Sequence, residues 1–97
     1  MSYWLHPEAE AEFGDAAVYY AEHANKSIAA AFVTEFERVL ALLITNQHLG
    51  SPADGGLRMY PFRRFPYSLV YREDPDGPQV YAVAHQHREP NYWRERL

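Results

Sequence analysis

The segment "LRMYPFRRFPYSLVYRED" (residues 57–74) decides the fold, because it holds two strand-forming stretches on either side of a short turn. Aromatic and β-branched residues are frequent in both stretches, as they are in strands. Pro61 and Pro66 lack the backbone N–H that a sheet uses, so we expect them at strand ends or edges. The pattern predicts two strands that turn near Arg63 and Arg64.

Two further signals follow on the C-terminal side. The residues of "DPDGP" (74–78) are typical of a tight turn, and "QVYAVAHQ" (79–86) predicts a last strand. After Pro90 the chain is expected to form a short C-terminal helix.

The N-terminal half of the chain has a helical pattern after a short first strand. The aromatic run at residues 2–6 is the expected strand, and it leads into Pro7, a residue favoured at the first position of a helix. Apolar residues then recur every three or four positions to about residue 23. Ser27 is the expected N-cap of a second helix that ends near Asn46. Residues 48–56 are rich in Gly, Pro, Ser and Asp and predict a loop.

The predicted element order is β-α-α-β-β-β, in one α+β domain over residues 1–97. A chain of this length buries roughly 60–65% of its unfolded surface, which is enough for a core without disulfides. It has no cysteine, no apolar run near the ~20 residues that span a bilayer, and no start typical of a signal peptide. We therefore expect a cytoplasmic protein without membrane association.

Charge is distributed unevenly along the chain. The net charge of −4 argues against a non-specific nucleic-acid binder, because such proteins neutralise phosphates with Lys and Arg. Residues 1–57 contain two basic and eight acidic residues, whereas residues 58–97 contain seven arginines and five acidic residues. The arginine-rich half predicts either a face for an anionic partner or a solvated strand face.

Two histidines come at the end of the last predicted strand. Side chains alternate along a strand, so Ala82 and Ala84 share one face while His85 and His87 share the other. We expect the small alanines to pack against the helices. That arrangement would leave the two imidazoles together on a partly open face.

Polar residues in this region have the chemistry for RNA cleavage. His85 or His87 could act as base or acid, Arg88 could hold phosphate, and Tyr92 could donate a proton or stack on a base. The competing interpretation is structural, with a strand end followed by a hydrophobic latch of Tyr92 and Trp93. No third ligand at a recognised spacing completes a zinc site, so we expect no metal and no cofactor.

Arginine and aromatic side chains alternate along the middle strands. Such a surface could stack and pair nucleotides, or anchor a protein partner, because arginine and aromatic residues are frequent interface anchors. The aromatic residues are also common core residues of a sheet. The candidate partner-binding residues are Arg58, Arg63, Arg64, Tyr67, Arg72, Tyr92 and Trp93.

Four blocks, in order and over nearly the whole chain, resemble the RelE/ParE superfamily of toxins from bacterial type II toxin–antitoxin modules. They are "HPEAEAEF" (6–13), "AAAFVTEFERVLALLITNQHLGSP" (29–52), "GLRMYPFRRFPYSLVYRED" (56–74) and "VYAVAHQHREPNYW" (80–93). The resemblance implies two N-terminal antiparallel helices packed on a twisted, mainly antiparallel sheet. It also implies a cognate antitoxin that wraps the toxin in a hetero-oligomer, neutralises it and often represses their shared operon.

The superfamily divides by target, which the fold does not settle. RelE-like members cut mRNA on the ribosome, whereas ParE-like members inhibit DNA gyrase without hydrolysing anything. The nucleases are typically basic and carry an arginine directly before "L-V-Y", where this chain has Ser68. Their second arginine corresponds to Gln86 or, with a shift of two, to Arg88, and Tyr92 is similar in position to a tyrosine that some of them use. The chain looks closer to the ParE-like branch.

Three hypotheses follow from the residues and the resemblance. The leading one is a ParE-like, plasmid-stabilisation type toxin that acts by binding, with DNA gyrase as the implied target. The second is a ribosome-dependent mRNA endonuclease that uses His85 or His87 with Arg88 and Tyr92. The third is an antitoxin-bound regulator, or a decayed toxin without activity.

Overall fold

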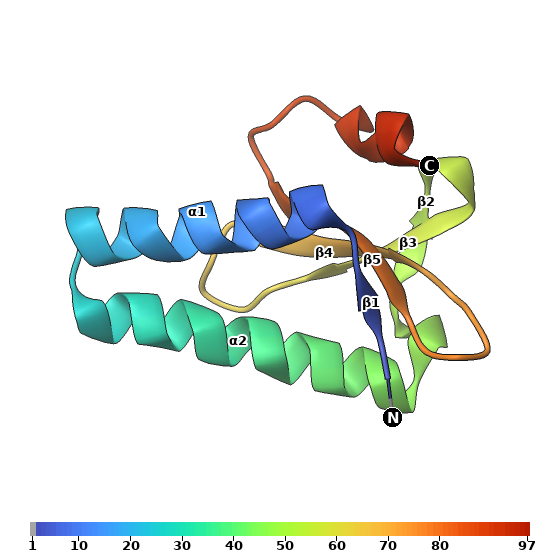
Figure 1. The fold of residues 1–97 in the computed structure, drawn as a ribbon, viewed down its shortest axis with the longest axis horizontal. Helices are drawn as coiled ribbons and strands as arrows, with labels where there is room; N and C mark the ends of the chain where they lie inside the picture. The colour runs from blue at the N-terminus through green and yellow to red at the C-terminus, as the bar shows by residue number, and fades with distance from the viewer. Residues whose placement is uncertain (1) are drawn as a thin grey trace.

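The computed structural model describes residues 2–97, in which two antiparallel helices lie across one face of a five-stranded sheet (Figure 1). The α+β class, the two N-terminal helices and the mainly antiparallel sheet confirm the prediction. A short 3-10 helix takes the place of the predicted C-terminal helix. In chain order the elements are β1 (Trp4–Leu5), α1 (Pro7–His23), α2 (Lys26–Thr45), η1 (Gln47–Leu49), β2 (Ser51–Ala53), η2 (Asp54–Gly56), β3 (Leu57–Pro61), β4 (Tyr67–Arg72), β5 (Gln79–His85) and η3 (Tyr92–Arg96).

Side-chain caps fix where the helices begin. The His6 Nδ1 accepts a hydrogen bond from the Glu8 backbone N–H (3.0 Å), directly before the proline that opens α1. At α2 the cap is Asn25, whose Oδ1 accepts a hydrogen bond from the Ile28 N–H (2.8 Å). The prediction that Ser27 caps α2 was therefore wrong by two residues. Asparagine caps as well as serine does, so an earlier asparagine could start the helix first.

The sheet has the strand order β1-β5-β4-β3-β2. β1 pairs with β5 in parallel, and all other neighbours are antiparallel. β2 lies in the segment expected to be a loop, and it pairs with β3 so that Ser51 lies opposite Met59 and Ala53 opposite Leu57. It is a three-residue edge strand containing Pro52, a position that tolerates proline and leaves no periodic signal in the sequence.

β5 is buried on both faces, which reverses the predicted assignment of its two sides. Val83 faces the helices with Leu69, whereas Ala82 and Ala84 pack with Trp93 on the opposite face. The alternation was right, but the expectation that the alanines pack against the helices was wrong. The C-terminal segment folds back over the sheet, so Trp93 supplies the second cover that the small alanines accommodate.

A β-bulge shifts the register between β4 and β5. Val70 lies opposite Ala82 while the next residue, Tyr71, lies opposite Val80, so that Tyr81 is the extra residue. Tyr81 therefore joins the cluster on the face away from the helices, together with Ala82. Strict alternation, which would group Tyr81 with the residues facing the helices, fails at this point because bulges interrupt the two-residue period.

The main core lies between the helices and the sheet. Aromatic rings dominate it: the Phe32 ring centroid is 5.2 Å from that of Tyr67 and 5.4 Å from that of Phe65. Burying side chains of this size stabilises the fold by roughly 1.5–3 kcal/mol each.

No helix in residues 2–97 is both long and apolar enough to span a membrane.

Candidate partner-binding site

Glu12 on α1 is the centre of a polar cluster that joins α1 to β5 and to the C-terminal segment. Its Oε1 accepts hydrogen bonds from the backbone N–H of Val83 (3.0 Å) and from Arg96 Nη1 (2.9 Å). Its Oε2 accepts from the Tyr92 hydroxyl (2.7 Å), from Arg96 Nη2 (2.8 Å) and from Arg88 Nη1 (3.2 Å). One carboxylate therefore connects residues as far as 84 positions apart.

The same cluster covers the edge of β5 beyond β1. β1 pairs with only two residues of β5. Further along, the Val83 N–H donates to Glu12, and the Tyr81 carbonyl oxygen accepts a hydrogen bond from Arg96 Nη1 (2.9 Å). Side chains here satisfy backbone groups that a longer β1 would otherwise pair, as buried backbone groups require.

The cluster fixes the protonation states of its members. Burial raises the pKa of Glu12, but hydrogen bonds from Arg96, Tyr92 and the Val83 N–H outweigh burial and hold that pKa below its ordinary value. Burial, and then the hydrogen bond to Glu12, raise the pKa of the Tyr92 hydroxyl well above its usual range. Arg96, only 5% exposed in its side chain, is held charged because Glu12 raises its pKa. Glu12 and Arg96 form an ion pair, and Tyr92 keeps its proton.

A shallow hollow of about 260 Å³ opens between α1 and the ends of β4 and β5. Aromatic and charged side chains share its walls, and the rings of Tyr67 and His85 lie edge to face at a centroid distance of 5.0 Å. Tyr19, 54% exposed, stands at its rim. The hollow is lined by Glu12, Asp15, Ala16, Tyr19, Tyr67, Val83, His85, Arg88 and Tyr92.

The four candidate catalytic residues lie close together. The rings of His85 and His87 are 5.3 Å apart, and the His87 backbone N–H donates to His85 Nδ1 (3.0 Å). His87 lies in the turn after β5, so only His85 belongs to the strand, on the side of the hollow. Arg88 lies 3.8 Å from the Tyr92 ring centroid, and both bind Glu12.

Within residues 2–97 no group of three or more His, Cys, Asp or Glu is placed to hold a metal ion.

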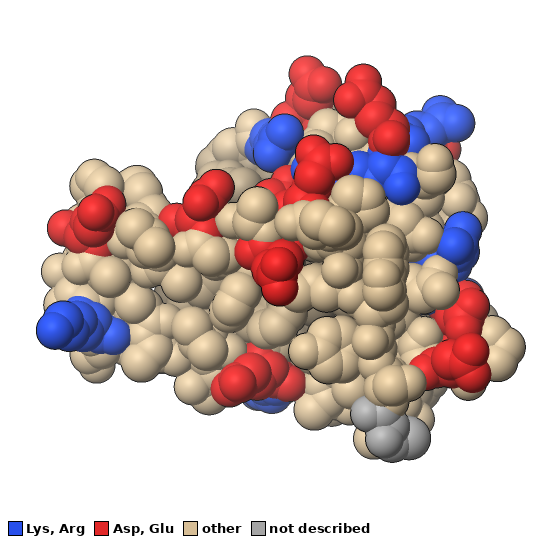
Figure 2. Space-filling view, in the orientation of Figure 1, with Lys and Arg blue, Asp and Glu red and all other residues tan. Residues whose placement is uncertain are grey.

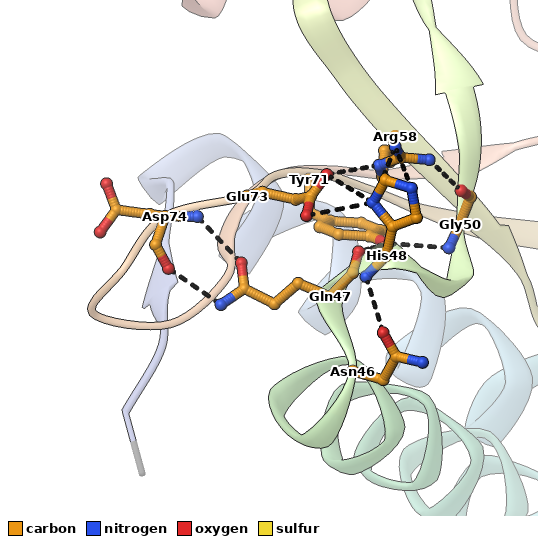
Figure 3. Close-up of polar contacts among 8 residues, drawn as sticks. All are labelled: Asn46, Gln47, His48, Gly50, Arg58, Tyr71, Glu73 and Asp74. Carbon is orange, nitrogen blue, oxygen red and sulfur yellow. Dashed lines mark hydrogen bonds and ion pairs between the residues drawn. The ribbon is translucent and has the colours of Figure 1, made fainter.

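Arg58 is committed to the connection between α2 and β2 (Figure 3). Its Nε donates to Glu73 Oε1 (2.6 Å), its Nη1 to the Gly50 carbonyl (2.6 Å), and its Nη2 lies 3.0 Å from His48 Nδ1. Beside it, the Tyr71 hydroxyl accepts from the Gly50 N–H (2.9 Å). The Arg58 side chain is only 18% exposed. The role of Arg58 in partner binding stays a prediction, and these contacts leave little of its side chain open to a partner.

Trp93 is also withdrawn from the surface, since it is 4% exposed and packs on the alanine face of β5. Its indole Nε1 is buried, with no hydrogen-bond partner among the described residues. Arg72 remains exposed, but its guanidinium donates to Gln79 Oε1 (2.8 Å) and lies 5.3 Å from the Tyr81 ring centroid. Among the predicted partner-binding residues, Tyr67 and Tyr92 line the hollow, and Arg63 and Arg64 are exposed at the turn between β3 and β4.

The turn between β3 and β4 carries Arg63 and Arg64, as predicted. Glu35 on α2 holds this turn, because its Oε2 accepts a hydrogen bond from the Arg63 backbone N–H (2.6 Å). Arg38 donates to both Glu35 oxygens, at 2.8 and 2.6 Å. The hydrogen bond from Arg38 outweighs burial and lowers the pKa of Glu35. Glu35, 9% exposed, is the one charged residue in the described chain that is buried as a whole residue, backbone included.

The sequence interpretation missed Glu12, Arg96 and Glu35. A detectable signal existed for Glu35, since it stands within the apolar stripe of α2, between Phe32 and Phe36. Glu12 lies in the opening turns of α1, where the helix dipole favours negative charge, and that is a sufficient local reason for a glutamate there. Its distant partners leave no local pattern.

Charged side chains are not mixed evenly over the molecule. On the face that carries the two helices, Figure 2 shows acidic side chains along α1 and a mixture of acidic and basic side chains over the C-terminal segment. The exposed acidic residues of α1 include Glu8, Glu10, Asp15 and Glu22. The exposed side of α1 would repel a polyanion.

Residues 3–90 match the family model described as the ParE toxin of the type II toxin–antitoxin system parDE. Among solved structures, the chain is similar to one titled "Chromosomal ParDE TA system from P. aeruginosa", at 22% identity and a TM-score of 0.75. That match covers 88% of this chain and 95% of the other, and at this identity it shows a shared fold. No curated protein matches the chain.

Proposed function

Because the chain belongs to the ParE toxin family of type II toxin–antitoxin systems, we propose that a cognate antitoxin neutralises it and that it acts by binding DNA gyrase. In this proposal the toxin works in the cytoplasm, in a hetero-oligomer with its antitoxin, and hydrolyses nothing. The family match supports the antitoxin, and the gyrase target rests on the resemblance to ParE-like toxins.

The Glu12 cluster is the observation that supports a mechanism of binding over one of RNA cleavage. RNA cleavage needs a cation free to hold the charged phosphorus centre and an acid able to release a proton. Here Arg88 donates to Glu12, and so does the Tyr92 hydroxyl, whose pKa burial and Glu12 raise. A tyrosine with a raised pKa is a poorer proton donor, and a neutralised arginine attracts phosphate less. Both groups therefore support a structural role better than a catalytic one.

A supercoiling assay with purified DNA gyrase tests the target. The protein should inhibit supercoiling at micromolar concentration, and prior addition of the antitoxin encoded beside the toxin gene should restore activity. Expression in cells should induce the DNA damage response before translation stops. Full gyrase activity at micromolar toxin, together with immediate translation arrest, would remove gyrase as the target.

One observation favours the ribonuclease alternative. The rings of His85 and His87 lie 5.3 Å apart, and His85 lines the same hollow as Arg88 and Tyr92. If this set cuts RNA, the combined variant His85→Ala, His87→Ala and Tyr92→Phe should abolish growth arrest on expression. The control is His23→Ala, since His23 is an exposed histidine at the far end of α1. Growth arrest that survives the triple variant excludes this mechanism.

A further inference from the structure

The β3–β4 hairpin contains four arginines, and two of them make side-chain contacts with other residues of the molecule. Residues 55–72 contain no acidic residue, so these arginines need partners from elsewhere. Arg58 forms an ion pair with Glu73, the residue directly after the hairpin, with 2.6 Å between Nε and Oε1. Arg72 finds Gln79 Oε1 (2.8 Å) and the face of the Tyr81 ring. The remaining pair lies at the tip of the hairpin.

Arg63 and Arg64 are both exposed. Within residues 2–97 neither guanidinium comes within 4.0 Å of a carboxylate oxygen. Arg64 has only a loose contact with the Phe65 ring, at 5.9 Å from its centroid. The hairpin tip therefore presents two adjacent positive charges, neither of which forms an ion pair within the described chain.

The tip is held rigidly. Phe62 and Phe65, on either side of the arginines, are 7% and 9% exposed and belong to the main core. Glu35 binds the Arg63 N–H. Arg64 has a φ of 67°, a left-handed conformation that costs a non-glycine residue on the order of 1 kcal/mol or more. Because the backbone is fixed before any partner arrives, binding at the tip loses little conformational entropy.

The aromatic hollow lies next to this tip. The Tyr20 ring contacts both, with its centroid 5.2 Å from that of Phe65 and 6.4 Å from that of Tyr67. Tyr67 is also a wall of the hollow. A rigid pair of cations beside an aromatic hollow fits an extended segment that carries carboxylates and one apolar side chain. Arginine pairs well with carboxylates because its planar fork donates two parallel hydrogen bonds.

We propose that the Arg63–Arg64 tip and the hollow beside Tyr67 form one docking surface for an acidic segment of the cognate antitoxin. Carboxylates of that segment pair with the two arginines, and an apolar side chain fills the hollow. The inference rests on the proposed function, because it needs an antitoxin, and it adds the chemistry that the antitoxin segment must have.

A protein segment suits this surface better than a nucleic acid. DNA or RNA would bring many phosphates toward a molecule of net charge −4 with exposed acids along α1. Two arginines release too few counterions to hold a duplex, since affinity for DNA scales with the number of phosphates neutralised. A short acidic segment needs only the two charges that the tip offers. The antitoxin is the protein partner that the match to the parDE family implies.

The test compares two double variants that remove the same charge. Arg63→Gln with Arg64→Asn removes the tip arginines, and asparagine tolerates the left-handed backbone at position 64. Lys26→Gln with Arg94→Gln removes two exposed charges elsewhere. The dissociation constant of each for the purified antitoxin is measured by calorimetry over a range of ionic strength, and thermal unfolding confirms that each variant folds.

The tip variant should bind the antitoxin at least about tenfold more weakly and lose much of its salt dependence, while the control variant stays within about twofold. Tyr19→Ser, at the rim of the hollow, should weaken binding with no change in salt dependence. If the two folded double variants bind the antitoxin with equal affinity, the inference is overturned but the toxin assignment stands. The same conclusion follows if the tip variant loses only binding to duplex DNA. Failure of the unmodified protein to bind the antitoxin overturns the proposed function itself.

Discussion

At the scale of single residues, Glu12 has the most partners of any carboxylate in the described chain, and its replacement tests the cluster. Glu12→Gln leaves Arg96, 5% exposed in its side chain, with only the exposed Glu8 carboxylate, 3.7 Å away, as a counter-charge. Breaking a buried ion pair in this way typically costs about 3–5 kcal/mol. We expect the free energy of unfolding, measured with urea, to fall by about 3 kcal/mol. Glu10→Gln, an exposed change on the same helix, should alter it by less than about 0.5 kcal/mol.

The lowered pKa values of the Glu12 and Glu35 carboxyl groups make the stability of the fold depend on pH. Glu12 and Glu35 both have a pKa below the ordinary 4.5 in the folded protein, so the unfolded chain binds protons more readily. Their contribution is fully present above about pH 4.5 and is lost as the pH falls through the folded values. Urea midpoints should therefore drop on acidification below pH 4.5. Glu12→Gln should flatten that drop, and an unchanged slope in this variant would contradict the assignment.

At the scale of elements, two glycines have opposite environments. Gly14 lies in the interior of α1, and an added Cβ would meet nothing within 4 Å, so Gly14→Ala should stabilise the protein by about 0.5–1 kcal/mol. At Gly50 a Cβ would lie 2.6 Å from the Tyr71 hydroxyl oxygen and 3.1 Å from the Met59 carbonyl oxygen. Gly50→Ala should destabilise it by roughly 1–3 kcal/mol, because the neighbours must move. Thermal unfolding of both variants measures the contrast.

The connection from α2 to β2 depends on Arg58. Removing this side chain leaves the Gly50 carbonyl oxygen without its side-chain donor, which should cost about 2 kcal/mol. Hydrogen exchange at the Gly50 N–H should accelerate in Arg58→Ala, since the Tyr71 hydroxyl that binds it belongs to the same cluster. Arg72→Ala serves as the matched control and should leave that exchange rate unchanged. Equal exchange rates in both variants would show that Arg58 is not needed for this connection.

At the scale of the whole molecule, local patterns predicted both helices and the three longest strands, whereas the short edge strand β2, the N-cap of α2 and the contacts distant in sequence escaped prediction. Both helices, the turn at Arg63 and the strand after residue 78 follow from periodicity and turn residues that lie within a few positions of one another. The side of β5 that faces the helices depends on where Trp93 folds back, which no local pattern records. The Glu12 cluster joins residues 71 to 84 positions apart, so its geometry appears only in the folded chain.

Those same separations determine when the toxin can form during its own synthesis. β5 is the strand between β1 and β4, so the sheet cannot be completed until residue 85 has emerged from the ribosomal exit tunnel. The Glu12 cluster forms later still, because Arg96 must first leave the exit tunnel. Nascent chains stalled before these residues emerge should be digested rapidly by protease, whereas released chains should resist. A growing chain would therefore remain harmless to its host until translation of this domain is complete.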